Sequence, residues 1–262
     1  MLKLNSKNFE KTKDFLEEKY QKYNHLDFIE NDPIQIPHRF TKKQDIEISA
    51  LFAAVLAWGL RKTIINKCNL LMELMDNSPH DFILNYTDSD IKKIGFQEFK
   101  HRTFNATDLL YFLDFLQRFY QKNDSLEILF SSKETQKDNL AHFHTAFFDV
   151  DYAPHRTKKH ISTPIRKSAC KRLNMYLRWL VRRDNKGVDF GIWKTISPSI
   201  LICPLDIHVE RESKKLGLME RTISDWKAAE ELTQNLRLFD KNDPVKYDFA
   251  LFGLGIENKV RK

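Results

Sequence analysis

Two helices with chemically distinctive first turns constrain the fold of this chain most strongly. Over residues 168–181, apolar side chains recur at three- and four-residue steps, which predicts an amphipathic helix with Ser168 as its cap. A second helix is predicted to begin after Asp206 as its N-cap and to end at Gly217. The segment therefore places one amine, that of Lys171, and one carboxylate, that of Asp206, near two helix starts.

The second face of the first helix is cationic. Lys171, Asn174, Arg178 and Arg182 follow one another at three- and four-residue steps and are neighbours on a helix. Between residues 155 and 186 the chain has eleven Lys or Arg and one acid, within a protein of net charge +7. A basic block in an otherwise mildly acidic chain is typical of a protein that binds a polyanion. The alternative is a basic surface that contacts only solvent.

These residues carry a resemblance. The stretch Lys171-Arg-Leu-Asn174-Met-Tyr-Leu, followed by Leu205-Asp206-Ile-His208-Val, is similar to the Lys-x-x-Asn and Val-Asp-x-His-Val signatures of the helix-hairpin-helix DNA glycosylases. The whole chain resembles a bacterial family with no assigned function, which we interpret as a divergent branch of that superfamily. The resemblance implies that Lys171 attacks the sugar of a damaged nucleotide and that Asp206 assists. It also implies two helical lobes with a cleft.

Further site residues follow from the same resemblance. Residues 47–67 are similar to the helix, turn and helix that open the superfamily's core, and they imply that the turn from Trp58 to Arg61 intrudes into DNA. Nucleic-acid contacts are expected from Arg61, Arg166, Lys167, Arg172, Arg178 and Arg182, and a base pocket or wedge from Trp58, Trp193 and His208. Two features depart from the family. The hairpin at residues 163–169 contains no glycine, and Lys171 and Asp206 are 35 positions apart because residues 184–199 are inserted.

Composition favours an all-α protein. The chain has only 7 Gly and 8 Pro in 262 residues, and long amphipathic patterns dominate it. We predict a single domain over residues 1–262 with two sub-lobes, in which the basic motif segment covers residues 155–217. The periodicity predicts helices over residues 8–23, 45–58, 63–75, 105–120, 139–148, 225–238 and 243–252.

No cofactor or metal is expected. Cys68, Cys170 and Cys203 are widely spaced, so the chain lacks the four cysteines of an iron-sulfur cluster, and three unpaired cysteines indicate a cytoplasmic protein. No apolar run is long enough to span a bilayer, so no membrane association is expected. The pair His80-Asp81 allows a weaker hypothesis of a metal-dependent phosphohydrolase, although Ser78-Pro-His80-Asp81 also has the pattern of an ordinary helix start.

The sequence thus predicts a DNA-binding protein that takes part in base excision repair. The leading hypothesis is a DNA glycosylase acting on damaged double-stranded DNA, with or without lyase activity, and with no obligate protein partner. The alternative is a non-catalytic nucleic-acid-binding protein on the same fold. Each residue alone has a simpler interpretation, since Lys171 could contact a phosphate and Asp206 could act only as an N-cap.

Overall fold

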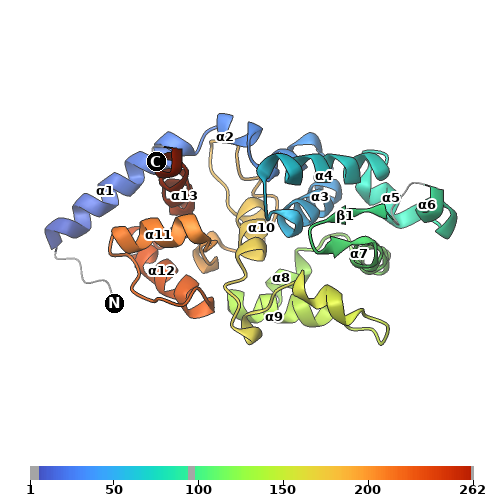
Figure 1. The fold of residues 1–262 in the computed structure, drawn as a ribbon. Coiled ribbons are helices and arrows are strands. Elements are labelled where there is room, and N and C mark those ends of the chain that lie inside the picture. Colours follow the sequence, from blue (N-terminus) through green and yellow to red (C-terminus); the bar gives the residue numbers. More distant parts are fainter. Residues whose placement is uncertain (1–5, 94–97, 261–262) are drawn as a thin grey trace. The chain divides into compact units, whose positions relative to one another are not determined.

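The computed structural model describes residues 6–93 and 98–260, and it is mostly helical, as predicted (Figure 1). The chain divides into two compact units. The terminal unit consists of the residues up to Glu30, residues 134–138 and the residues from Thr163 onward. The central unit consists of residues 31–133 and 139–162. Lys171 and Asp206 both belong to the terminal unit, whereas Trp58 and Arg61 belong to the central unit.

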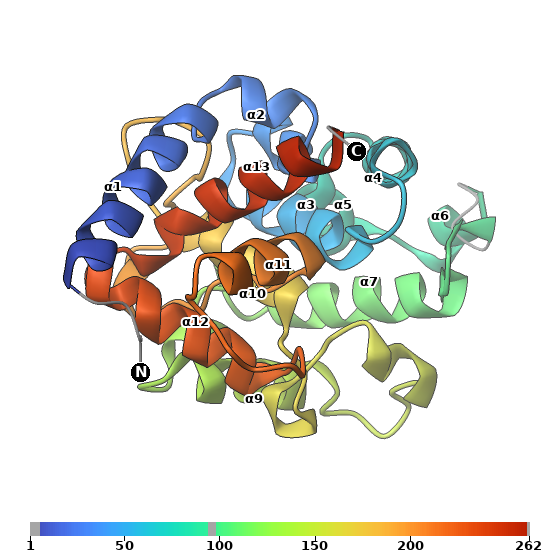
Figure 2. The ribbon, with the colours of Figure 1, turned by 60° about the vertical axis from the view of Figure 1, so that its left-hand side comes forward.

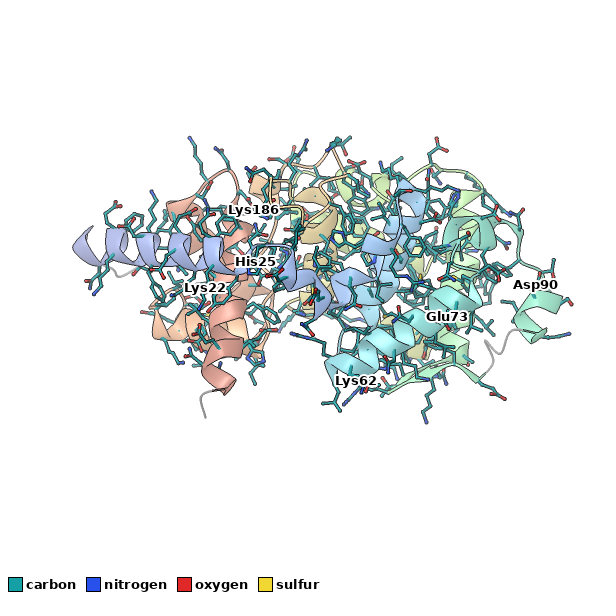
Figure 3. All side chains as sticks on the ribbon, turned by 90° about the horizontal axis from the view of Figure 1, so that it is seen from above. Lys22, His25, Lys62, Glu73, Asp90 and Lys186 are labelled. Atoms are coloured by element: carbon teal, nitrogen blue, oxygen red, sulfur yellow. The ribbon has the colours of Figure 1, made fainter. Side chains whose placement is uncertain are left out.

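The central unit is built around α3 (Lys43–Leu56), whose residues from Ile46 to Leu56 are all buried. Helix α3 packs against α4 (Arg61–Leu74) and α5 (Pro79–Asn85), and Lys62 and Glu73 mark the two ends of α4 in Figure 3. The other elements are η1 (Pro33–Gln35), η2 (Pro37–Arg39), α6 (Asp88–Lys93), β1 (Lys100–His101), β2 (Phe104–Asn105), α7 (Ala106–Tyr120), α8 (Ile128–Ser131), α9 (Gln136–Phe147) and η4 (His155–Lys159). The first three residues of α9 belong to the terminal unit. Strands β1 and β2 form an antiparallel hairpin.

Helix α7 shows why these sequences form these elements. Asn105 caps it in a capping box with Asp108, so two backbone N–H groups of the first turn are satisfied. Its buried stripe includes Phe112, which packs edge-on against Phe147 of α9. Fully burying a side chain of this size contributes about 1.5–3 kcal/mol. The apolar periodicity of the sequence, which predicts a helix over residues 105–120, thus gives the start of α7 to within one residue.

The terminal unit includes α13 (Tyr247–Val260), against which two other helices pack. Helix α13 lies beside α1 (Ser6–Tyr23) and contacts α11 (Ile207–Lys215), and Figure 2 shows α1 and α13 side by side. The other elements are α2 (Asp27–Glu30), η5 (Pro164–Arg166), α10 (Lys171–Val181), η6 (Pro198–Ile200), α12 (Trp226–Phe239) and η7 (Pro244–Lys246). Among the described residues, no helix has the length and apolar character needed to cross a membrane.

The predicted end of the last helix, at Phe252, is wrong. Helix α13 continues to Val260, because Gly253 and Gly255 are positions of close packing and do not terminate the helix. A Cβ at Gly253 would lie 2.3 Å from the ring of Tyr23 on α1, and one at Gly255 would lie 2.6 Å from Cβ of His208 on α11. The absent side chains thus let two helices approach α13 along its C-terminal half.

Candidate functional site

Lys171 is the first residue of α10, directly after a hairpin with unusual backbone geometry. The helix begins two residues later than predicted, with Cys170 in place of Ser168 as its N-cap, because Cys170 is left-handed, with φ of 50°, and Lys167 has φ of 62°. Ser168 accepts a hydrogen bond from the backbone N of Cys170 at 3.1 Å. The buried Asn174 donates from Nδ2 to the carbonyl of Ala169 at 3.0 Å. The Lys-x-x-Asn spacing therefore joins the helix to the hairpin that precedes it.

The amine of Lys171 lies half-buried along the first turn of α10. Its Nζ is 3.2 Å from Sδ of Met175, one turn further on. Within the described part of the chain, no carboxylate forms an ion pair with this amine. Burial lowers the pKa of the neighbouring Arg172 guanidinium. Lys171 is therefore an amine without a neutralising partner, next to a second, partly desolvated cation.

Asp206 caps α11, as predicted. Its Oδ1 accepts from the backbone N of His208 at 2.8 Å and from that of Val209 at 2.9 Å. No described residue donates to its Oδ2. The N-cap role fixes the orientation of the carboxylate and leaves one oxygen able to act on another molecule.

Lys171 and Asp206 both influence the pKa of a buried carboxylate, that of Asp248 on α13. Burial raises its pKa to about 6, while Arg178 lowers it, Asp206 raises it and Lys171 lowers it. The buried thiol of Cys203 lies 4.0 Å from Oδ1 of Asp248, and burial raises its pKa well above the usual range. Lys171 and Asp206 thus both influence the pKa of the same buried carboxylate.

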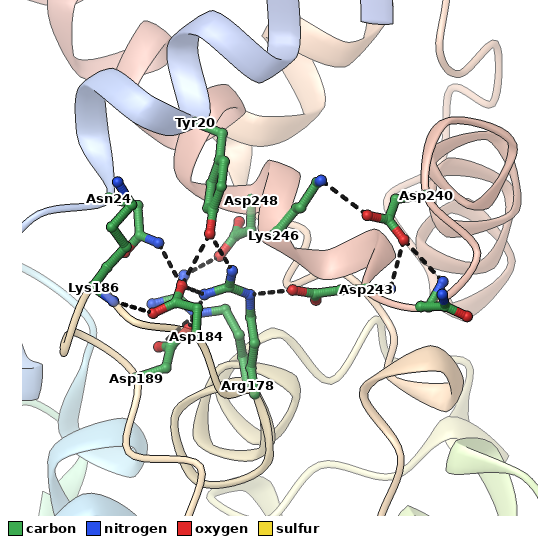
Figure 4. A network of polar contacts seen from close by, with 12 residues as sticks. Tyr20, Asn24, Arg178, Asp184, Lys186, Asp189, Asp240, Asp243, Lys246 and Asp248 are labelled. Carbon is green, nitrogen blue, oxygen red and sulfur yellow. Dashed lines mark hydrogen bonds and ion pairs between the residues drawn. The ribbon is translucent and has the colours of Figure 1, made fainter.

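The predicted cationic face of α10 is wrong for Arg178 and Arg182. Their side chains are buried, with exposed fractions of 3% and 0% for the two residues. Arg178 donates to Asp248 and, from Nε, to Asp189 at 3.3 Å (Figure 4). Arg182 pairs with Asp184 at 2.8 Å, Asp189 at 3.0 Å and Asp243 at 2.9 Å, and donates to Tyr20 at 2.7 Å. Neither guanidinium can reach a phosphate, because both are held inside the terminal unit.

The predicted base-stacking role of Trp193 is also wrong. Trp193 is fully buried and packs edge-on against Tyr176 of α10, with ring centroids 5.4 Å apart. The inserted segment therefore folds back into the core. His208 follows Asp206 in α11 and packs edge-on against Phe252, so its ring joins α11 to α13.

Three other basic residues of this region have exposed side chains that a ligand could contact. Arg166 and Lys167 in the hairpin are exposed, as is Arg183 after the end of α10. Arg172 is partly exposed at the start of α10. Of the residues predicted to contact nucleic acid in this segment, the accessible ones thus lie at the hairpin and at the start of α10, and not along the buried face of that helix.

In the central unit, Trp58 lies in the turn between α3 and α4. The guanidinium of Arg102 stacks on its ring at 4.6 Å, and His101 forms a hydrogen bond through Nε2 to its carbonyl at 3.1 Å. Arg61 is the half-buried first residue of α4, and the preceding Leu60 is 77% exposed. Sequence reasoning missed Arg102 and Leu60. A signal for Leu60 was available, because it follows Gly59 outside the apolar period of α3.

His80 and Asp81 form an ordinary helix start. Pro79 occupies the first position of α5, and Asp45 of α3 accepts from the backbone N of His80 at 2.8 Å. The imidazole of His80 packs edge-on against Tyr120. Among residues 6–93 and 98–260, no group of three or more His, Cys, Asp or Glu is arranged to hold a metal ion.

Sequence reasoning missed the acidic partners of the cluster, Asp189, Asp243 and Asp248. No local motif identifies them, and Asp243 is only the first residue of the last predicted helix. Asp248 gave one usable signal, because it is the one charged residue within the stretch Tyr247–Leu251.

Comparison with curated proteins and with solved structures found no match. One family model matches most of the chain, from residue 32 to residue 257. The match includes the central unit, the hairpin, Lys171, Asp206 and Asp248. As predicted, the protein belongs to a family without an assigned function, the one described as Protein of unknown function (DUF2400).

Proposed function

We propose that the protein binds damaged DNA and acts as a DNA glycosylase, with Lys171 as nucleophile and Asp206 as the assisting carboxylate. One observation carries the proposal. An amine at the start of α10 and a carboxylate at the start of α11 act on the same buried residue, Asp248, although they are 35 positions apart in sequence.

The state of the Lys171 amine supports a role as nucleophile. A structural lysine usually pairs with a carboxylate, whereas this half-buried amine contacts only a thioether among its described neighbours. The amine would displace the base from C1′ of the sugar, and opening of the sugar ring would then give a Schiff base.

The geometry of Asp206 supports its assisting role. Departure of a base leaves positive charge on the sugar, and a nearby carboxylate stabilises that charge. Two backbone hydrogen bonds hold Oδ1, so the carboxylate need not reorganise when the charge develops. Oδ2 would face the sugar or orient an attacking water.

The hairpin supports DNA binding. In the resembling superfamily this hairpin is rich in glycine, and here Lys167 and Cys170 adopt left-handed conformations that glycine adopts more readily. The glycine-free sequence thus keeps left-handed backbone conformations at two positions of this hairpin. The exposed Arg166 and Lys167 would contact DNA phosphates, and the target nucleotide would have to leave the stacked duplex to reach Lys171.

A base-release assay tests this function. Purified wild-type protein, Lys171→Gln, Asp206→Asn and the control Lys241→Gln would be incubated under single-turnover conditions with duplexes carrying 8-oxoguanine, an alkylated purine or uracil. Lys241 is exposed and lies outside the cluster. We expect release from at least one duplex by wild type and Lys241→Gln, and a loss of about 10²-fold or more in the other two variants.

Absence of release from every duplex, together with salt-sensitive DNA binding, would instead support a non-catalytic nucleic-acid-binding protein. In that case Lys171→Gln would weaken binding only slightly, because it removes a single phosphate contact.

A further inference from the structure

The amine of Lys171 contacts the thioether of Met175. Nζ of Lys171 lies 3.2 Å from Sδ of Met175. The two residues are four positions apart on α10, so their side chains lie on the same side of the helix. The lysine stem extends along the first turn until its amine reaches the sulfur atom. The contact is therefore made within one helix.

Met175 itself is held in place. It is 7% exposed, and it belongs to the part of α10 from Leu173 to Val181 in which every residue is buried. The neighbouring Asn174 ties this turn to the hairpin, because its Nδ2 donates to the carbonyl of Ala169 at 3.0 Å. The sulfur atom is thus a fixed point, whereas Lys171 is half-buried and its stem is flexible.

A thioether is chemically unlike the partner that a helical lysine of this protein has at the same spacing. Lys214 of α11 pairs with Glu210, also four positions away, at 2.5 Å. A carboxylate beside a lysine amine stabilises the protonated form of that amine. A thioether is a weak and uncharged acceptor, so it can orient an amine without placing a negative charge beside it.

A nucleophilic amine needs both of these properties. It attacks through the lone pair of its neutral form, so a partner that stabilises the ammonium form opposes the reaction. It must also be held close to the reacting carbon, because a misplacement of about 1 Å can cost about 10²-fold in rate. A carboxylate at position 175 would hold the amine and its proton, and an aliphatic side chain would hold neither. The thioether of Met175 holds the amine alone.

We propose that Met175 is a positioning residue that holds the amine of Lys171 in place for its attack on the sugar. The proposal rests on the function proposed above, because Met175 acts only through Lys171. It adds to the site a residue that lies outside the Lys-x-x-Asn spacing.

NMR spectra of protein labelled with ¹³C-lysine test the contact without DNA. A held amine keeps the two Hε protons of its lysine inequivalent, whereas free rotation averages their chemical shifts. The signal of Lys171, identified by its absence from Lys171→Gln, should show two Hε shifts in wild type and one averaged shift in Met175→Leu. The control Met219→Leu replaces another buried methionine of the terminal unit and should keep both shifts. Leucine has a volume similar to that of methionine, so both variants should fold, which their melting temperatures would verify.

Single-turnover borohydride trapping with an abasic-site duplex tests the consequence for the reaction. Met175→Leu should lower the rate constant at saturating duplex by about tenfold and leave the Kd for the duplex unchanged, because the amine is present but no longer held. Met175→Glu should lower the rate constant by about 10²-fold, since the new carboxylate stabilises the ammonium form. Met175→Gln has the size of Met175→Glu without its charge and should retain more of the rate. Met219→Leu should react like wild type.

The two measurements separate failure of this proposal from failure of the proposed function. One averaged Hε shift for Lys171 in wild type, or two shifts in Met175→Leu, would overturn the contact. An unchanged rate constant in Met175→Leu, or a loss confined to the Kd, would overturn the positioning role while Lys171 remained the nucleophile. Absence of an adduct in wild type would overturn the proposed function, and with it the role of Met175 in catalysis, whichever NMR result is found.

Discussion

Arg178 of α10 donates a hydrogen bond to Asp248 of α13 in the interior of the terminal unit, where the two residues are 3% and 4% exposed. The guanidinium also lies 4.3 Å from the ring centroid of Phe249. The residue that the sequence pattern places on a DNA-binding face thus joins two helices from within. Lys171 and Asp206 also influence the pKa of Asp248. The ion pair between Arg178 and Asp248 therefore links the packing of the unit to the proposed active site.

Replacing Arg178 by Met should strongly destabilise the protein. The change would leave Asp248 as a buried carboxylate without its main partner, and breaking such a pair typically costs about 3–5 kcal/mol. Urea denaturation followed by circular dichroism would measure the loss. Arg183→Met, at an exposed position next to α10, should change the free energy of unfolding by no more than about 0.5 kcal/mol. Equal effects of the two changes would contradict the buried role of Arg178.

The carboxyl group of Asp243 should make stability depend on pH in an unusual direction. Burial raises its pKa to about 6, despite the lowering effect of Arg182. Between about pH 4 and 6 the folded protein therefore holds a proton that the unfolded chain, with a pKa near 3.9, has released. The contribution of this group to stability is present at low pH and is lost as the pH rises through 6.

Asp243→Asn removes that titration. The free energy of unfolding of wild type and variant would be measured at several values between pH 4 and pH 7. Loss of the titration would appear as a difference between the two proteins in the slope of this free energy against pH. We expect the stability of the variant, relative to wild type, to increase as the pH rises through this window. Parallel plots of the free energy of unfolding against pH for the two proteins would mean that Asp243 has an ordinary pKa in the folded protein.

Gly253→Ala should destabilise the terminal unit even though alanine is the better helix former. The gain in helix propensity is about 1 kcal/mol, but the new Cβ would lie 2.3 Å from the ring of Tyr23. Overpacking of this kind typically costs about 1–3 kcal/mol, so we expect a lower melting temperature. In a Tyr23→Ala background the same change should be neutral or stabilising. An additive double-mutant cycle would show that the two residues do not compete for space.

Arg166→Gln should weaken DNA binding without affecting the fold. Its side chain is exposed in the hairpin. Loss of one phosphate contact should reduce the slope of log K against log salt by about 1, as measured by fluorescence anisotropy with a duplex. Lys241→Gln is the matched control and should leave the slope unchanged. If both variants behave like wild type, the hairpin does not contact DNA.

Most of the helices could be predicted from sequence, because their apolar periodicity and their capping residues are local. Asp206 caps α11 as predicted, and Asn105, the first residue of the predicted helix, caps α7. The start of α10 was displaced because the left-handed conformation of Cys170 has no sequence signature. The end of α13 was missed because the roles of its glycines depend on Tyr23 and His208, from distant segments.

The candidate site was only partly predictable for the same reason. Lys171 and Asp206 belong to local motifs, and their positions at helix starts follow from those motifs. Arg178 and Arg182 are buried because they pair with acids that are up to 70 positions away in sequence. From the sequence of the helix alone, its face therefore looks cationic and solvent-exposed. Trp193 was assigned to an insertion and expected near the surface, but the insertion contributes to the core against Tyr176.

Borohydride trapping tests the central role of Lys171 most directly. Wild type, Lys171→Gln and Lys241→Gln would be incubated with borohydride and duplexes carrying an abasic site or a damaged base, and the products digested for mass spectrometry. We predict a covalent DNA adduct in wild type and Lys241→Gln, located on the peptide that contains Lys171, and no adduct in Lys171→Gln. An adduct that persists in Lys171→Gln, or that maps to another lysine, would contradict the assignment of Lys171 as the nucleophile.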